Sequence, residues 1–274
     1  MNELSLDHVV IGVSDLEASS ATWSQVLGRS YSWRGRHPDY GTANILFRLD
    51  NAYIELLALD SNASRTTPWT AGLAIFLAEK GDGIYALALQ TPDVARSAAG
   101  LREKGLAIED PADGEGVDLD TGAVRHWTNA RISAEASGGA RCFVIEHRSP
   151  PDALPRSALT VPAEAGVVSL PVVGMETENI EAARNLWRNV FSLAEVPLSG
   201  GWRYDLDKAG LILRGGVGSG GDLPHRWSLV VLEVARLDAV RERLGVDYEE
   251  GHFLGKPGLL LSASGATLFL LEES

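Results

Sequence analysis

The feature that most constrains this chain is a pattern of one strand, one helix and further short strands that recurs four times. In the first copy an apolar stretch over residues 6–13 predicts a strand, and Asp15 follows it as a helix N-cap. Apolar residues at helical spacing continue as far as Gly28, a residue typical of a helix end. Three short strands are then predicted over residues 30–33, 43–49 and 52–57. The first copy therefore has the order βαβββ.

The pattern returns three times further along the chain. Asp93 and Asn179 are the expected N-caps of the second and third helices, whereas Arg236 is a weak cap for the fourth. Because a βαβββ unit cannot bury both faces of its sheet alone, we expect the copies to pair. The fold class is accordingly α+β, with four βαβββ modules paired into two tandem domains. The first strands of the later copies are predicted over residues 84–90, 167–175 and 227–234.

A proline-rich stretch lies between the second and third copies. Pro150, Pro151, Pro155 and Pro162 disfavour both helix and central strand there. We therefore expect the chain to divide at this stretch. The expected parts are a first domain over residues 1–148, a linker over residues 149–166 and a second, degenerate domain over residues 167–274.

The composition limits the partners of the chain. Its 274 residues include 24 Lys and Arg against 37 Asp and Glu, which gives a net charge of −13 at pH 7. This surplus of acid disfavours nucleic acid and anionic membranes as partners, because binding to their phosphates needs clustered cations. We expect a small-molecule substrate or ligand, no nucleic-acid partner and no membrane partner, and we leave open whether the chain forms a homodimer.

The sequence also indicates a cytoplasmic location. Residues 1–8 lack the basic start and apolar run of a signal peptide, and no apolar stretch reaches the roughly 20 residues that span a bilayer. The single cysteine, Cys142, lies in the apolar run of residues 142–145 and is expected to be a buried, unreactive thiol. These features are typical of a soluble protein in a reducing compartment.

Three segments of the first copy resemble a known superfamily. Residues 6–16, 41–44 and 53–57 are similar to the glyoxalase-like branch of the vicinal oxygen chelate superfamily. This superfamily includes glyoxalase I, methylmalonyl-CoA epimerase, extradiol dioxygenases and the bleomycin-resistance proteins. The resemblance implies paired βαβββ modules whose mixed sheets curl into a cup. It also implies a divalent metal held by the first and last strand of each module.

Under this resemblance, four positions of the first half correspond to metal ligands. They are occupied by His8, Glu55, Ala86 and Glu146, so that one position carries no donor atom. The resemblance therefore implies a divalent ion (Zn, Ni, Co, Mn or Fe) held by His8, Glu55 and Glu146, and no organic cofactor. Three protein ligands with one open position are a common arrangement in catalytic zinc sites.

A second interpretation needs no metal. Glu55 lies in an otherwise apolar row of its strand, and a buried carboxylate requires a partner. Arg48 or Arg131 is a candidate partner, while Glu146 would face solvent at the end of its strand and His8 would be hydrogen-bonded within the cup wall. The sequence leaves the two interpretations open.

Other residues are candidates for contact with a substrate. His37 precedes a strand in a loop, where functional groups tend to lie. His147 is excluded because neighbouring residues of a strand point to opposite faces and Glu146 is placed in the cup. The expected substrate-binding residues are Trp33, His37, Tyr53, His126 and Trp127.

Two functions are consistent with these residues. The first is a metal-dependent isomerase or lyase that acts on a small oxygenated metabolite, with Glu55 or Glu146 as the catalytic base. Ring cleavage of the extradiol type is disfavoured because Ala86 stands where a second histidine is needed. The alternative is a metal-free protein of the bleomycin-resistance type that binds a small apolar or aromatic molecule in the cup. On either interpretation, the second half would have an architectural or dimerising role.

Overall fold

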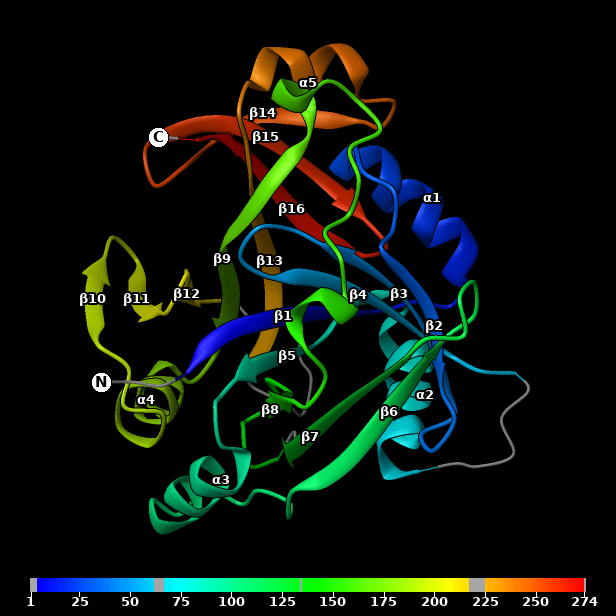
Figure 1. Ribbon diagram of the computed structural model, residues 1–274. Helices are drawn as coiled ribbons and strands as arrows, with labels where there is room; N and C mark the ends of the chain where they lie inside the picture. Colours follow the sequence, from blue (N-terminus) through cyan, green and yellow to red (C-terminus); the bar gives the residue numbers. More distant parts are fainter. Residues whose placement is uncertain (1–3, 62–66, 134, 217–224, 274) are drawn as a thin grey trace.

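The chain folds into two eight-stranded mixed sheets with few helices (Figure 1). The computed structural model describes residues 4–61, 67–133, 135–216 and 225–273. The predicted α+β class with two mixed sheets is confirmed. The first sheet comprises β1 (Ser5–Gly12), β2 (Trp33–His37), β3 (Thr42–Arg48), β4 (Tyr53–Leu59), β5 (Gly83–Gln90), β6 (Ala112–Asp118), β7 (Val124–Ile132) and β8 (Cys142–His147).

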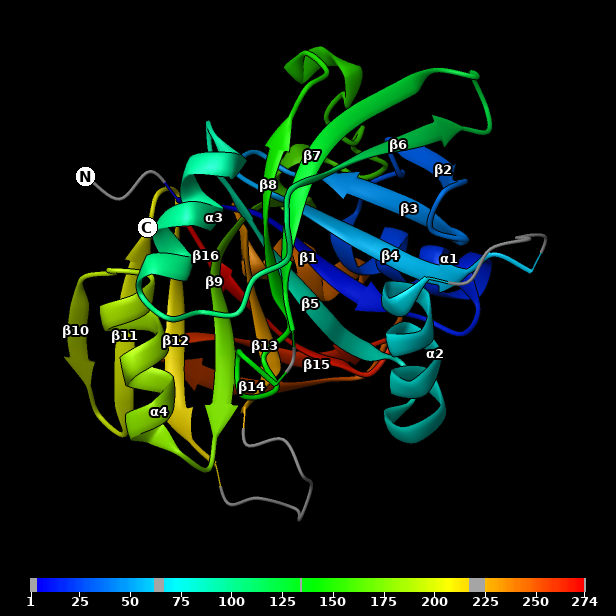
Figure 2. The ribbon, with the colours of Figure 1, turned by 90° about the horizontal axis from the view of Figure 1, so that it is seen from below.

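The first sheet closes on itself in the order β1-β4-β3-β2-β6-β7-β8-β5. Its two seams are the antiparallel pairs of β1 with β5 and of β2 with β6. β1 runs parallel to β4, with His8 beside Tyr53 and Val10 beside Glu55 in the register. Closure gives this sheet an enclosed concave face, as the view in Figure 2 shows from below.

The second sheet stays open, in the order β10-β11-β12-β9-β13-β16-β15-β14. Its strands are β9 (Val167–Thr177), β10 (Glu195–Leu198), β11 (Gly201–Leu206), β12 (Ala209–Gly215), β13 (His225–Val234), β14 (Tyr248–Phe253), β15 (Lys256–Ala263) and β16 (Ala266–Glu272). The helices are α1 (Leu16–Leu27), α2 (Pro68–Lys80), α3 (Val94–Glu103), α4 (Ile180–Arg184) and α5 (Leu237–Arg243). A π-helical stretch follows α4 at Asn185–Val190, and short 3₁₀ helices lie at Pro151–Ala153 and Ala163–Ala165.

The predicted helix caps of α1 and α3 are present in the structure. The Asp15 carboxylate accepts a hydrogen bond from the Ala18 amide, and Gly28 ends α1 with a φ of 64°. At α3, the Asp93 carboxylate accepts from the Arg96 amide. These caps satisfy amide groups that the helices leave without partners, so the sequence sets where each helix begins.

Four strands differ from the prediction. β2 lies at Trp33–His37, later than the expected residues 30–33. β6, β10 and β14 complete the βαβββ pattern of their copies but were not placed in the sequence, because ADGEGVD, EVPL and YEEGHF lack a clear apolar alternation. Of these, β10 and β14 form the edges of the open sheet, where polar residues face solvent.

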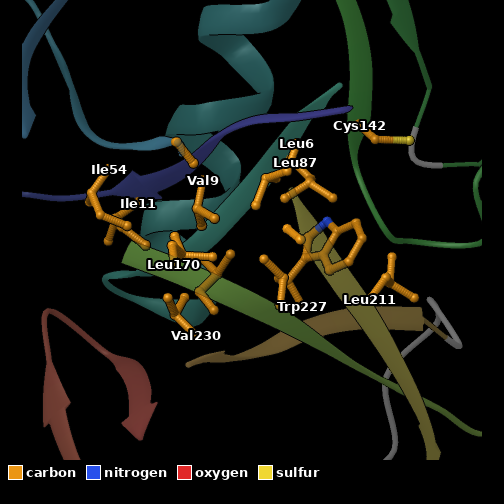
Figure 3. Close-up of a cluster of buried hydrophobic side chains, with 14 of the residues drawn as sticks. Leu6, Val9, Ile11, Ile54, Leu87, Cys142, Leu170, Leu211, Trp227 and Val230 are labelled. Atoms are coloured by element: carbon orange, nitrogen blue, oxygen red, sulfur yellow. The ribbon is translucent and has the colours of Figure 1, made fainter. Parts of the chain in front are cut away.

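The two sheets share one apolar core (Figure 3). Val9 and Ile11 of β1 pack in the same cluster as Leu170 of β9 and Val230 of β13. Cys142 lies in this cluster and is fully buried, which raises the pKa of its thiol to about 12. The thiol is therefore protonated at neutral pH, in agreement with the expectation of an unreactive cysteine.

The proline-rich segment follows the edge of the first sheet. The Ser157 amide donates to the Arg48 carbonyl over 3.0 Å, and the Ser30 amide donates to the Ala158 carbonyl over 2.9 Å. Its path is thus fixed by backbone hydrogen bonds to β3 and to the end of α1. No helix in the described ranges has the length and apolar character needed to cross a membrane.

Candidate active site

A pocket of about 590 Å³, including its mouth, opens on the concave face of the first sheet. Its polar floor includes His8 from β1 and Glu55 from β4, while Tyr53, Trp127 and Phe143 contribute aromatic wall. β4 places every second residue, Tyr53, Glu55 and Leu57, in this pocket, since side chains alternate between the faces of a strand. A pocket with apolar walls and a few converging polar groups is the usual form of a small-molecule site.

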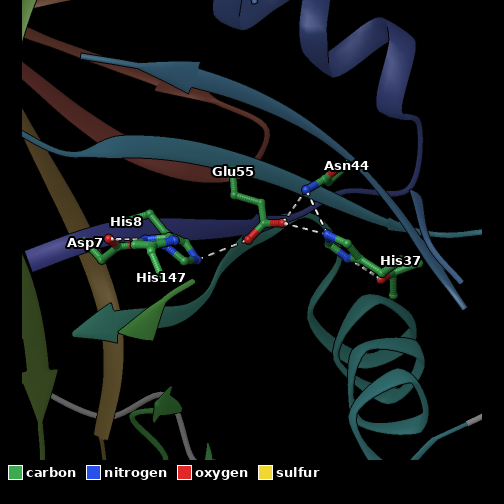
Figure 4. Close-up of polar contacts among 7 residues, drawn as sticks. Asp7, His8, His37, Asn44, Glu55 and His147 are labelled. Carbon is green, nitrogen blue, oxygen red and sulfur yellow. Dashed lines mark hydrogen bonds and ion pairs between the residues drawn. The ribbon is translucent and has the colours of Figure 1, made fainter. Parts of the chain in front are cut away.

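His8 lies between two carboxylates at the base of this pocket (Figure 4). Its Nδ1 is 2.6 Å from Asp7 Oδ1, and its Nε2 is 3.2 Å from Glu55 Oε2. The Tyr53 ring stacks on the imidazole with 4.3 Å between the ring centroids. All of these groups are buried, so the three charges interact with little screening by water.

The neighbours of His8 control its charge. Burial alone would lower the pKa of His8, but the hydrogen bonds and charges of Asp7 and Glu55 raise it to about 9. Burial likewise opposes ionisation of Glu55, yet contact with His8 holds the pKa of this carboxyl below its ordinary value. At neutral pH the site therefore contains an imidazolium and an ionised Glu55.

The other oxygen of Glu55 is held by an amide. Asn44 Nδ2 donates to Glu55 Oε1 over 2.8 Å and lies 3.1 Å from His37 Nε2. His37 Nδ1 in turn lies 2.9 Å from Thr42 Oγ1. Burial lowers the pKa of His37, so this ring is neutral and its Nε2 accepts from Asn44. The amide thus fixes the orientation of both Glu55 and His37.

Two expectations about β8 are corrected. Glu146 was expected to face the cup and His147 to face away, whereas His147 lines the pocket and Glu146 does not. His147 Nε2 lies 2.8 Å from Asp7 Oδ2. Glu146 instead accepts a hydrogen bond from the Val94 amide at the start of α3 and pairs with Arg148. The error is one residue in the phase of the strand, which exchanges its two faces.

The predicted substrate-binding residues also fall into two groups, those that line the pocket and those that do not. His37, Tyr53 and Trp127 line the pocket. His126 is exposed on the opposite face of β7, and Trp33 is buried behind the pocket wall in a cluster with Tyr53. The expectation that His126 and Trp33 themselves line the cup is therefore corrected.

Several residues of the site were missed in the sequence. Asp7 directly precedes His8, but nothing in the strand pattern indicates that its side chain pairs with two histidines. On β7, Arg125, Trp127, Asn129 and Arg131 all line the pocket, and their spacing of two residues is the signal that was available. Trp69 of α2 also lines the pocket.

Neither arginine suggested as a partner of Glu55 pairs with it. Arg48 donates to the backbone carbonyl of Leu154, and Arg131 lies 3.7 Å from Glu109. The buried carboxylate is compensated by His8 and Asn44 instead.

The donor set does not fit the expected three-ligand metal centre. Of the three predicted ligands, His8 and Glu55 converge while Glu146 faces away, and Ala86 adds no donor. Across the ranges that the structure describes, no group of three or more His, Cys, Asp or Glu side chains is arranged to hold a metal. His8 Nε2 is buried, and its 3.2 Å contact with Glu55 Oε2 is poorly aligned for a hydrogen bond, so both atoms lie together on the lining of the pocket.

Among the described residues of the second sheet, no group of polar side chains comparable to that of His8 and Glu55 lines a pocket. A cluster of buried apolar side chains occupies it, formed by Val172, Ile212, Val231, Phe253, Phe269 and Leu271. Candidate chemistry in the described chain is thus concentrated in the first sheet.

The His8 environment predicts how stability depends on pH. A folded pKa of about 9 against an ordinary value of 6.5 means that protonation of His8 stabilises the fold by about 3 kcal/mol. This contribution is complete below pH 6.5 and is lost as the pH rises through about 9. We expect the difference in unfolding free energy between the wild type and His8→Gln to shrink across this window. Denaturant unfolding at a series of pH values measures it, and a difference independent of pH would contradict the assignment.

The first sheet curls around an imidazole on its first strand and a carboxylate on its fourth, as the resemblance to glyoxalase-like proteins implies. A family model described as a glyoxalase-like domain matches residues 6–191, and the chain belongs to this family.

Individual relatives agree with this assignment. An ethylmalonyl-CoA/methylmalonyl-CoA epimerase from Cereibacter sphaeroides is 31% identical over 104 residues, which are 38% of this chain and 72% of the epimerase. A hypothetical protein from Staphylococcus aureus has a TM-score of 0.70 at 16% identity, covering 98% of this chain and 100% of that one. A Mn(II)-bound glyoxalase from Novosphingobium aromaticivorans has a TM-score of 0.63 at 14% identity, covering 98% and 82%. The two structures show similarity of fold.

Proposed function

We propose that this chain is an isomerase or lyase that transfers a proton on a small oxygenated metabolite bound in the pocket of the first sheet. The observation that carries the proposal is the ionised Glu55 carboxylate, buried at the base of an aromatic pocket with His8 beside it. The epimerase named among the relatives supports the same kind of chemistry.

In this proposal Glu55 accepts a proton from a substrate carbon next to a carbonyl group. The electron pair of the broken C–H bond moves onto the carbonyl oxygen and forms an enolate. The imidazolium of His8, which is paired with Glu55 in the structure, donates a hydrogen bond from Nε2 to that oxygen. In an isomerase Glu55 then delivers the proton to a different carbon of the delocalised anion, and in a lyase the enolate instead expels a leaving group from its β-carbon with that group's bonding electrons.

The proposal routes no step through a metal, because only His8 and Glu55 of the predicted ligands converge. We expect protein purified without chelators to contain well under one equivalent of divalent metal per chain. Elemental analysis by inductively coupled plasma mass spectrometry measures this content. One tightly bound equivalent that disappears in His8→Ala would contradict the expectation and restore the metal-dependent alternative.

The proposed reaction is tested by proton exchange with solvent. The protein is incubated in D₂O with a panel of small oxo acids and with methylmalonyl-CoA, and loss of the α-proton signal is followed by ¹H NMR. We expect faster loss with at least one compound than in buffer alone, and the rate should survive treatment with EDTA. Exchange that appears only after addition of a divalent metal would contradict the mechanism.

A metal-free binding protein is the second candidate. The aromatic wall of the pocket favours it, since Trp69 and Phe143 of the lining pack edge to face. The exchange assay separates the two functions, because a binding protein would bind compounds of the panel without catalysing exchange.

A further inference from the structure

The side chain of Arg125 is a buried cation for which the described protein provides no anion. Arg125 lies on β7, lines the pocket and is 8% exposed. Its guanidinium lies over the Trp33 ring, with 5.3 Å to the ring centroid. Among the described residues it makes neither an ion pair with a carboxylate nor a side-chain hydrogen bond.

The acids nearest to the pocket floor already have partners. Glu55 is held by His8 and Asn44, and Asp7 is held by His8 and His147. The charge of Arg125 does reach the site, since it contributes to lowering the pKa of the neutral His37. A buried guanidinium with five N–H donors and no acceptor is costly, unless an anion or water occupies the space beside it.

Arg131, at the far end of the same strand face, shows the contrast. It lies 3.7 Å from the Glu109 carboxylate and is sandwiched between aromatic rings, with its guanidinium 4.6 Å from the Tyr40 centroid and 5.3 Å from that of Trp69. Its positive charge is therefore partly compensated within the protein. Of the two arginines in the pocket, Arg125 is the one whose charge is left for a ligand.

We propose that Arg125 binds the carboxylate of the substrate, which makes the substrate a small organic acid. This inference rests on the proposed function and names its substrate class. A carboxylate matches the planar fork of a guanidinium with two parallel hydrogen bonds, and a single arginine balances its single charge. A phosphate ester carries close to two negative charges and is matched less well by one guanidinium beside a neutral His37.

Trp127 provides an apolar surface for the organic part of this ligand. It lies between Arg125 and Asn129 on the pocket face of β7 and packs edge to face on His37, with 5.3 Å between ring centroids. The indole lies close against β6, where a Cβ atom on Gly114 would be 2.6 Å from Trp127 Nε1. The ring is thus fixed as an apolar wall next to the anion site.

Binding of three matched probes tests the inference. Phenylacetate, the neutral phenylacetamide and phenyl phosphate are titrated into the full chain by isothermal titration calorimetry. We expect phenylacetate to bind at least roughly tenfold more tightly than the other two, because one charge-assisted hydrogen-bonded pair contributes enough binding free energy for a difference of this size. Equal affinity for phenylacetate and phenylacetamide would overturn the inference, and a preference for phenyl phosphate would replace the carboxylate by a phosphate.

Variants test whether Arg125 is responsible for the preference for phenylacetate over phenylacetamide. Arg125→Gln should reduce phenylacetate affinity at least roughly tenfold and leave phenylacetamide unchanged, and Arg125→Lys should recover part of the loss. Arg226→Gln is the control, because Arg226 is exposed on β13 and pairs with Glu176. Undiminished phenylacetate affinity in Arg125→Gln would overturn the inference. If Arg125→Gln fails to fold, the affinities of the three probes for the wild type and for Arg125→Lys are compared instead, and equal phenylacetate and phenylacetamide affinities in the wild type would overturn the inference.

Glu55→Gln separates this inference from the proposed reaction. It should bind phenylacetate at least as tightly as the wild type, since it removes a negative charge from the pocket. If Arg125-dependent binding is found but no compound exchanges its α-proton, the anion site stands and the enzymatic proposal falls. If exchange is found and its KM is unchanged in Arg125→Gln, the enzymatic proposal stands and the anion site falls.

Discussion

Glu55→Gln is expected to lower the rate of α-proton exchange by roughly 10²- to 10⁴-fold, the usual contribution of a general base. The amide cannot accept the proton, but it is nearly isosteric with the carboxylate and retains an oxygen that accepts from Asn44. The exchange assay in D₂O measures the effect. A comparable rate in Glu55→Gln would show that another group removes the proton.

Glu146→Gln is the matched control for this variant. Glu146 was an equal candidate for the base in the sequence, yet it lies outside the pocket and caps α3 through the Val94 amide. A glutamine oxygen can accept the same hydrogen bond, so we expect the exchange rate to stay within about twofold of the wild type. A large loss in this variant would indicate that the face assignment of β8 in the structure is wrong.

Asp7→Asn is expected to lower the free energy of unfolding by about 3–5 kcal/mol, the usual effect of removing one partner of a buried ion pair. Asp7 is 6% exposed and contacts His8 and His147 through different oxygens. Burial alone would raise its pKa, but the two histidines hold the pKa well below the ordinary value of 3.8. The carboxylate therefore stabilises the fold fully above that pH, and its contribution is lost as the pH falls further.

Chemical denaturation at neutral pH and at about pH 3 measures this effect. The difference between the wild type and Asp7→Asn should be largest at neutral pH and smaller in acid. Asp238→Asn is the control, because Asp238 is 76% exposed in its pair with Arg241 and should cost less than about 1 kcal/mol. Equal small losses in both variants would contradict a buried network around Asp7.

The α+β class followed from local patterns in the sequence, whereas the curled mixed sheets were implied by the family resemblance. Asp15 and Asp93 mark helix starts with short-range hydrogen bonds to the next residues, so each could be recognised from a few positions. β10 and β14 could not be recognised, since edge strands owe their conformation to a neighbouring strand rather than to their own apolar residues.

The residues of the site could be predicted only in part from the sequence, and the reason is physical. His8 and Glu55 lie on strongly apolar strands whose phase is clear, and the structure brings them together. Glu146 and His147 are neighbours at the end of β8, where both residues are polar and the alternation gives no phase. The pairs of Asp7 with His147 and of Asn44 with Glu55 join different strands, and a single sequence does not indicate such contacts.

Chemistry between His8 and Glu55 on a carboxylate ligand requires that ligand to lie in the pocket of the first sheet. A crystal structure of the full chain with phenylacetate bound shows where it lies. We expect the phenylacetate carboxylate to pair with Arg125 and its methylene carbon to lie about 3–3.5 Å from a Glu55 oxygen. Phenylacetate bound outside this pocket, or a methylene carbon turned away from Glu55, would rule out the proposed reaction at this site.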